Sequence, residues 1–119
     1  MMKGSLLVRR DRERIADMLE AAEKIRVRVA RGRARFDADE DLQIVLTHLI
    51  QVLGEAAARV SPGLTAAHPH LPWRALAGMR NRVVHEYFEI DLEILWSAAS
   101  QEVPALAIQL RAVQATEDT

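Results

Sequence analysis

The clearest helix signal in the chain is the stretch DADEDLQIVLTHLIQVLGEAAARV, residues 37–60. Asp37 is a suitable N-cap and Glu40 follows three residues later, which is the spacing of a capping box. Gly54 and the alanines after it form a surface of small side chains that another helix could approach closely. Hydrophobic residues recur at the spacing of one helical face: Leu42, Leu46, Leu49, Leu53, Ala56 and Val60. The stretch therefore predicts one long amphipathic helix, which ends at the Ser-Pro-Gly sequence of residues 61–63.

Three further helices are predicted on either side of this one. The first covers residues 8–30, because hydrophobic residues recur every seven positions within it. A loop follows residue 60, and Pro72 then suits the first turn of a third helix, residues 73–88. Asp91 is a fitting N-cap for the fourth, which continues to about residue 113 and should be kinked by Pro104. We therefore expect an all-α fold, an up-and-down four-helix bundle formed by a single domain over residues 1–119.

The composition excludes several classes of protein. Half of the 119 residues are hydrophobic and 28% are charged, as is typical of a globular domain. The chain has no Cys, which removes disulfides, thiol catalysis and most zinc sites. The longest early apolar run, residues 6–8, is too short for a signal peptide or a membrane span. We therefore expect a cytoplasmic protein that needs no metal or other cofactor and does not associate with membranes.

The net charge of −1 conceals an uneven distribution. Residues 1–36 contain eleven Lys and Arg against five acids, a balance of +6, whereas the rest carries five Arg against twelve acids, a balance of −7. A basic first segment could follow a nucleic-acid backbone. The same residues could equally be solvated helix faces, paired with Glu and Asp at i,i+4. Charge alone leaves both interpretations open.

Four chemically capable side chains lie within RNRVVHEY, residues 80–87. They are the guanidinium of Arg80, the amide of Asn81, the imidazole of His85 and the phenol of Tyr87. A guanidinium that stays protonated and an imidazole that titrates near neutrality suit reactions at a phosphodiester. Such a set could bind a phosphate, stabilise charge building on it and move protons around it. Arg80 and Tyr87 also interrupt an otherwise apolar helix face, and such departures from a folding pattern often mark sites.

Helix geometry limits how closely these groups converge. Asn81 and His85 share one face at i,i+4. The Cα atoms of Arg80 and His85, five residues apart, would be about 8–9 Å from each other and about 140° apart around the axis. A second copy of the helix across a two-fold axis would supply the missing convergence. A homodimer with one composite cleft is therefore the favoured arrangement.

Each of these four residues also has a purely structural interpretation. Arg80 could extend along the apolar stripe and pair with an acid, and His85 could be an ordinary surface or interhelical histidine. Asn81 could bond a neighbouring helix end, and Tyr87 could pack in the core with its hydroxyl at the rim.

The other polar candidates are weaker. Glu55 is expected to pack or pair beside Gly54 and, at most, to contact the site residues without touching a substrate. The three remaining histidines are not surrounded by carboxylates at the spacing that a metal site requires, and we interpret them as structural or solvated: His48, His68 and His70.

The stretch PWRALAGMRNRVVHEYF, residues 72–88, resembles the HepT-like proteins of the HEPN superfamily, the toxin halves of bacterial and archaeal toxin–antitoxin pairs. The resemblance extends over about residues 8–113 and is strongest from residue 53 to residue 96. An Arg-x4-His pair alone is common by chance, and its place in the longer string makes it specific. Flanking segments that fit the same family are residues 53–57, Ile90-Asp91, Trp96 and residues 104–106.

This resemblance implies a helical bundle that dimerises with two Arg-x4-His motifs facing each other, and metal-independent cleavage of RNA. Arg80 would hold the scissile phosphate, and His85 would act as general base or acid in attack by the RNA 2′-hydroxyl. Asn81 would orient His85 or the phosphate. The implied products are a 2′,3′-cyclic phosphate and a 5′-hydroxyl. DNA, which lacks the 2′-hydroxyl, should not be cut.

Tyr87 matches a branch of that family with the motif Arg-x4-His-x-Tyr. There the antitoxin is a minimal nucleotidyltransferase of the MntA type, which transfers AMP from ATP to the tyrosine, as in type VII toxin–antitoxin pairs. The added phosphates would place negative charge beside Arg80 and His85 and block RNA. Two other functions stay open: a non-catalytic subunit that presents nucleotide or substrate to the nucleotidyltransferase, and a dimerisation adaptor. The RNA that is cut and the association of dimers into higher oligomers stay open as well.

Overall fold

The structure, a computed structural model, describes residues 2–83 and 89–118. Within these ranges the chain forms seven α-helices and one π-helical segment. The α-helices are α1 (Met2–Val29), α2 (Arg33–Ala38), α3 (Glu40–Ala58), α4 (Pro62–Ala67), α5 (Trp73–Arg82), α6 (Leu92–Ser97) and α7 (Val103–Glu117), and the π-helical segment is Ala98–Glu102. The all-helical fold class predicted from the sequence is confirmed. None of the helices in the described ranges combines the length and hydropathy needed to cross a membrane.

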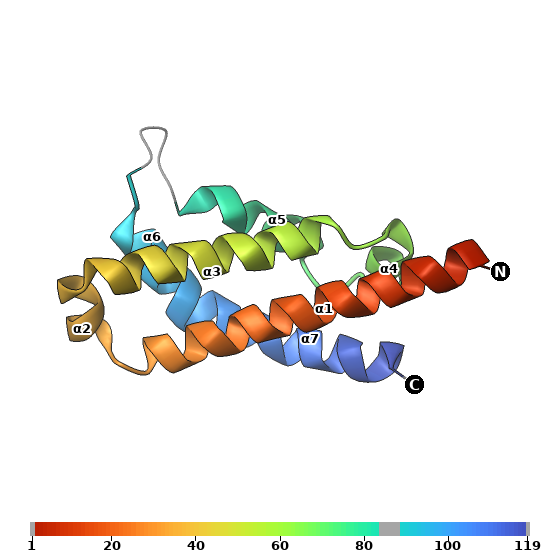
Figure 1. The fold of residues 1–119 in the computed structure, drawn as a ribbon, viewed down its shortest axis with the longest axis horizontal. Helices are drawn as coiled ribbons and strands as arrows, with labels where there is room; N and C mark the ends of the chain where they lie inside the picture. Colours follow the sequence, from red (N-terminus) through yellow and green to blue (C-terminus); the bar gives the residue numbers. More distant parts are fainter. Residues whose placement is uncertain (1, 84–88, 119) are drawn as a thin grey trace.

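The long helices run in alternating directions along one axis (Figure 1). α1 and α3 are antiparallel neighbours, α5 returns along α3, and the continuous stretch from α6 to α7 returns along α1. α3 therefore lies between α1 and α5. The molecule measures 52 × 29 × 22 Å. The path is the expected up-and-down one, with two short helices, α2 and α4, in connections where the sequence patterns predicted no separate helix.

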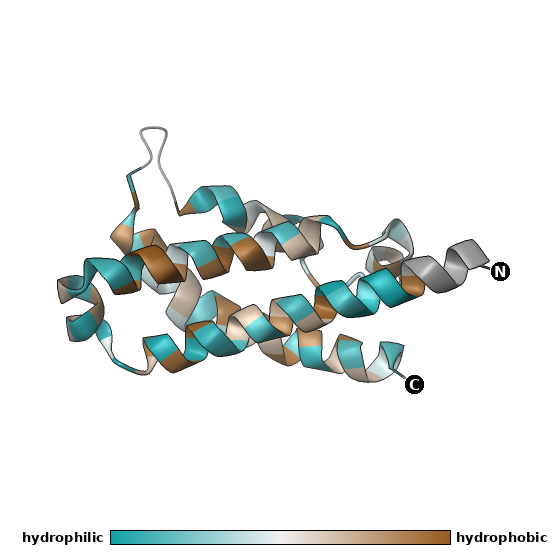
Figure 2. Ribbon diagram, in the orientation of Figure 1, coloured by the Kyte–Doolittle hydropathy of each residue, from teal (hydrophilic) through white to brown (hydrophobic). Residues whose placement is uncertain are grey.

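The core lies where the helices face one another, and the predicted apolar seams supply most of it (Figure 2). Burying each large aliphatic side chain stabilises the fold by about 1.5–3 kcal/mol. Val8, which begins the seven-residue hydrophobic repeat expected in residues 8–30, is instead 43% exposed. Fully buried side chains include Ile15, Met18, Ile25, Leu46, Ile50, Leu53, Leu76, Leu95 and Leu110.

The start of α3 differs from the prediction. Asp37 is not the N-cap, because it lies inside α2, where its carboxylate accepts a hydrogen bond from Arg33 Nε at 2.8 Å. The N-cap is Asp39, whose Oδ1 accepts from the Leu42 N–H at 3.1 Å. The predicted capping box of residues 37–40 is therefore wrong by two residues.

Gly32 and Phe36 explain why an extra helix precedes α3. Gly32 has φ of 94°, a left-handed conformation that glycine adopts without steric cost, so the chain can turn between α1 and α2. Phe36 is fully buried, and its ring centroid lies 4.9 Å from that of Trp96. This contact holds α2 against the beginning of the last helical stretch.

The segment after α3, predicted as a loop, contains α4. Ser61 is the N-cap, since its Oγ accepts from the Leu64 N–H at 3.2 Å, and Pro62 occupies the first turn. Asp11 of α1 fixes this start, because its carboxylate accepts from both the N–H (2.8 Å) and the Oγ–H (2.6 Å) of Ser61. The Ser-Pro pair that marks the end of α3 is therefore also a helix start, as proline at the first helical position allows.

The last helical stretch begins as predicted and is irregular near its proline. Asp91 caps α6 by accepting from the Ile94 N–H at 3.0 Å. The π-helical segment lies directly before Pro104, and the Val103 N–H donates to the Ala98 carbonyl five residues back. The sequence predicted a kink at Pro104, and the structure has a wider π-helical turn directly before this proline, which has no N–H for the regular ladder.

Candidate functional site

Arg80 lies in the last turn of α5, where that helix packs on α3. Its Nη1 donates a hydrogen bond to Oε2 of Glu55 at 3.0 Å, and its side chain is 38% exposed. The predicted pairing of Glu55 is confirmed, and its partner is the arginine of the candidate site. The guanidinium therefore remains within reach of a ligand from solvent.

Gly54 sets the distance between α3 and α5 at this point. A Cβ atom on Gly54 would lie 2.9 Å from the backbone nitrogen of Arg80, 3.0 Å from its Cβ and 3.1 Å from the carbonyl oxygen of Ala77. Cβ atoms essentially never approach another atom as closely as 2.9 Å, and here that atom belongs to the backbone, so only glycine lets the two helices approach so closely without a shift. The small-residue surface predicted on α3 thus positions Arg80.

An open groove of about 680 Å³ runs over the outer face of α3 beside Arg80. Its lining comes from α1, α3 and the end of α5, and its volume falls in the range of about 300–1,000 Å³ typical of ligand sites. Exposed Asn81 lines the same groove, so the structure brings two of the predicted site residues together. The groove is lined by three acids and four cations. The cations are Arg14, Lys24, Arg59 and Arg80.

Arg59 is a groove residue that the sequence reasoning did not single out. Its Nη2 lies 3.3 Å from Oε1 of Glu55, the carboxylate whose other oxygen accepts from Arg80. The i,i+4 spacing of Glu55 and Arg59, with the acid first, could have predicted this pair. The bond to Arg80, across 25 residues, could not have been read from spacing.

The end of α5 is held from two sides. Val83 is fully buried and its carbonyl accepts from the Asp91 N–H at 2.9 Å. Arg82 Nη2 donates to Oε2 of Glu102, in the π-helical segment, at 2.5 Å. These contacts fix both described ends of the segment that contains His85 and Tyr87. The third helix, predicted over residues 73–88, ends at Arg82 and is followed by Val83 as its C-cap, so the prediction of one helix as far as residue 88 is wrong. His85 and Tyr87 lie outside the described residues, so their predicted roles stay predictions.

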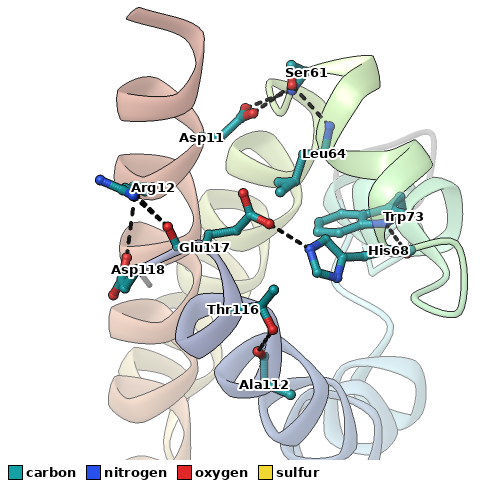
Figure 3. A network of polar contacts seen from close by, with 10 residues as sticks. All are labelled: Asp11, Arg12, Ser61, Leu64, His68, Trp73, Ala112, Thr116, Glu117 and Asp118. Carbon is teal, nitrogen blue, oxygen red and sulfur yellow. Dashed lines mark hydrogen bonds and ion pairs between the residues drawn. The ribbon is translucent and has the colours of Figure 1, made fainter. Parts of the chain in front are cut away.

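His68 has the structural role expected of it. It is buried, its Nε2 lies 2.9 Å from Oε2 of Glu117, and its carbonyl accepts from Trp73 Nε1 at 2.9 Å (Figure 3). Arg12 of α1 donates to the Glu117 carbonyl. Together these bonds join the end of α7 to α1 through Arg12, and to the start of α5 through His68 and Trp73. His48 and His70 are exposed, and His48 lines the groove. The described residues contain no cluster of three or more His, Asp and Glu side chains that could hold a metal.

Five of the eleven Lys and Arg in residues 1–36 form ion pairs that join described residues, and most of these pairs are local. Arg33 donates to Glu93 and to Asp37, and these hydrogen bonds, chiefly the one to Glu93, raise the pKa of its guanidinium. The other pairs join Lys24 to Glu20, Arg26 to Glu23, Arg35 to Asp39 and Arg12 to Asp118. Several of these are the i,i+3 and i,i+4 pairs of a solvated helix face. Arg14, which faces the groove, forms no ion pair with any described residue.

Comparison with known proteins assigns the chain to a family. The family model described as "Ribonuclease HepT-like" matches residues 18–113, a range that includes Glu55, Arg80 and the whole Arg-x4-His-x-Tyr motif. Significant similarity to a solved structure is not found.

Curated relatives carry matching names. A probable ribonuclease HepT of Thermococcus cleftensis is 31% identical over 71 residues, covering 60% of this chain and 64% of that protein. A candidate RNase of Methanocaldococcus jannaschii is 30% identical over 71 residues, covering 60% of this chain and 59% of its own length. A candidate RNase of Caldanaerobacter subterraneus is 30% identical over 78 residues, covering 66% of this chain and 70% of its own length. The match thus spans less than two thirds of the first two relatives. The chain belongs to the HepT-like ribonuclease family.

Proposed function

We propose that this protein is a metal-independent RNA endonuclease, the toxin of a type VII-like toxin–antitoxin pair. The observation that carries the proposal is the placement of Arg80. The close contact at Gly54 presents its guanidinium to an open, net-cationic groove, in a chain that belongs to a ribonuclease family. The motif residue His85 follows five positions later in the sequence.

In this proposal Arg80 binds the scissile phosphate and stabilises the charge that develops on it. His85 takes the proton from the RNA 2′-hydroxyl, or gives one to the leaving oxygen. The bond from the 2′-oxygen to phosphorus forms as the bond to the 5′-oxygen breaks, which leaves a 2′,3′-cyclic phosphate and a 5′-hydroxyl. Asn81, in the groove next to Arg80, orients the phosphate or His85.

The active site is proposed to be composite, with one groove from each protomer of a homodimer. Six large hydrophobic side chains are exposed among the described residues, and three of them lie on α3: Ile44, Val45 and Val52. Val52 lines the groove itself. A second copy that covers this face would remove apolar surface from water and bring a second Arg-x4-His motif to the first.

Neutralisation is proposed to occur at Tyr87, by AMP transfer from a partner nucleotidyltransferase of the MntA type. An AMP group two residues beyond His85 would bring a phosphate charge to the groove that holds Arg80. RNA would then be excluded by charge and by volume. The second candidate function, a non-catalytic nucleotide-binding subunit, draws support from the groove's ligand-sized volume and cationic lining.

The test is cleavage of a single-stranded RNA by the purified chain in EDTA, with DNA of the same sequence as control. We expect RNA-only cleavage, with a loss of about 100-fold or more in His85→Ala and in Arg80→Ala. Arg74→Ala is the matched control, because Arg74 is exposed on the same helix and does not line the groove.

Three outcomes would be decisive. Equal activity in the wild type and in His85→Ala would reject the proposed chemistry. Absence of cleavage together with binding of ATP or AMP would favour the non-catalytic subunit. Absence of cleavage with a mass increment of one or more AMP groups on Tyr87 would identify a silenced enzyme, to be assayed again as Tyr87→Phe.

A further inference from the structure

Glu55 is shared by two arginines. One carboxylate oxygen faces Arg59 Nη2 at 3.3 Å and the other accepts from Arg80 Nη1 at 3.0 Å. Among the ion pairs that join described residues, no other carboxylate pairs with two cations. The two guanidinium groups are thus bridged by one carboxylate, and the three side chains form a cluster with a net charge of +1.

The cluster is open to solvent and faces the groove. The side chains of Arg59, Glu55 and Arg80 are 57%, 49% and 38% exposed. An exposed carboxylate makes only a weak ion pair, because water and salt screen it. A phosphodiester offers two anionic oxygens in a fork much like a carboxylate, and guanidinium groups bind both in the same bidentate manner. RNA phosphates would therefore compete with the Glu55 carboxylate for both arginines.

Helix packing fixes the spacing of the two arginines. Arg59 is the C-cap of α3, with its N–H bonded to the Ala56 carbonyl, and Arg80 is held against Gly54 of the same helix. Both side chains thus start from one rigid contact between α3 and α5. Because every nucleotide of an RNA strand carries a phosphate, two cations on one groove can contact two neighbouring phosphates.

We propose that Arg59 is a second RNA-binding residue, which holds the phosphate next to the one bound by Arg80. Glu55 keeps the two guanidinium groups at this spacing until RNA displaces its carboxylate. The inference rests on the proposed function, since it assigns a role in RNA binding to a groove residue beyond the Arg-x4-His motif. The contribution of Arg59 to RNA binding can be measured with an RNA analogue that cannot be cleaved.

The experiment measures binding of a short 2′-O-methyl oligouridylate, which has no free 2′-hydroxyl and cannot be cleaved, between about 50 and 200 mM salt. For Arg59→Ala we expect the slope of log K against log salt to fall by about 0.7 and the affinity at about 0.1 M salt to fall roughly fivefold, as for one lost phosphate contact. Arg80→Ala should produce a similar loss, and the double variant about the sum.

Arg26→Ala is the matched control. Arg26 also pairs with a glutamate of its own helix, Glu23, is 65% exposed, and lies away from this groove. Its slope should equal that of the wild type. A slope for Arg59→Ala equal to that of Arg26→Ala would overturn the inference. If Arg59→Ala does not fold, as judged by its helical circular dichroism, Arg59→Gln replaces it with the same expectations.

Glu55→Gln tests whether the Glu55 carboxylate competes with RNA for the two arginines. Removing the competing charge should tighten binding at least about threefold, and the double variant Glu55→Gln/Arg59→Ala should lose that gain. Weaker binding by Glu55→Gln would overturn the role given to Glu55. If the wild type cleaves RNA in EDTA but Arg59→Ala leaves the salt slope of binding unchanged, this inference alone is rejected. If Arg59→Ala lowers the slope but the wild type does not cleave RNA, the proposed nuclease activity alone is rejected.

Discussion

Gly54 and Gly78 are two glycines in adjoining helices, and they differ in what surrounds them. A Cβ on Gly54 would collide with the backbone of α5 at Arg80, whereas a Cβ on Gly78 would meet no atom within 4 Å. Substitution by alanine should therefore have opposite effects on stability at Gly54 of α3 and at Gly78 of α5.

We expect Gly54→Ala to destabilise the fold by about 1–3 kcal/mol, because α5 must move outward to accommodate the methyl group. RNA cleavage should fall as well, because Arg80 moves with α5. Gly78→Ala should be neutral or stabilise by up to about 1 kcal/mol, through its higher helix propensity. Urea unfolding and the cleavage assay measure both effects. A Gly54→Ala protein with wild-type stability and activity would show that the close approach is unimportant.

At the scale of a helix, the start of α3 depends on a charged cap. The pKa of the Asp39 carboxyl is lowered, chiefly by the hydrogen bond from the Leu42 N–H and next by the hydrogen bond from Arg35. Folding therefore favours the ionised form. The resulting stability is present above the carboxyl's ordinary value near 3.8 and is lost as the pH falls through the lower folded pKa.

Asp39→Asn should test this dependence, because asparagine caps a helix without carrying a charge. We expect the wild type to melt at a higher temperature than Asp39→Asn at pH 7, and the difference to shrink below about pH 3.8. Asp41→Asn removes a charge from the same first turn without touching the cap, so its difference should change less with pH. A difference for Asp39→Asn that is constant from neutral to acid pH would contradict the assignment.

At the scale of the whole molecule, the exposed hydrophobic side chains of α3 are where a second protomer is proposed to pack. Val52 is 36% exposed in the groove, and Ile108 of α7 is 67% exposed on a different surface, between α1 and α7. If a second protomer covers the α3 face, Val52→Asp should convert the homodimer to a monomer and abolish cleavage, because a buried unpaired charge is costly.

Ile108→Asp should leave both the dimer and cleavage intact, although it removes a more exposed hydrophobic side chain. Sedimentation velocity at several concentrations measures the association state of each variant. A wild-type chain that sediments as a monomer at every concentration while cleaving RNA would reject the composite site. A dimer that is lost in Ile108→Asp and kept in Val52→Asp would place the interface on the other surface.

Much of the helical framework followed from local patterns. The apolar seams and the Asp91 cap were predicted because periodicity and capping act within a turn or two. The Asp37 cap was wrong because the Gly32 turn and the buried Phe36 create α2, and neither effect is visible in a capping pattern.

The sequence by itself determined that the chain is helical and where most helices lie, and it led to the prediction that residues 80–87 form a phosphodiester site. Only the tertiary structure decided that α5 meets α3 at Gly54, and that Glu55 joins Arg59 to Arg80. The physical reason is range. Helix signals act over about four residues, whereas these contacts depend on how two helices separated by a turn, a short helix and a loop pack together.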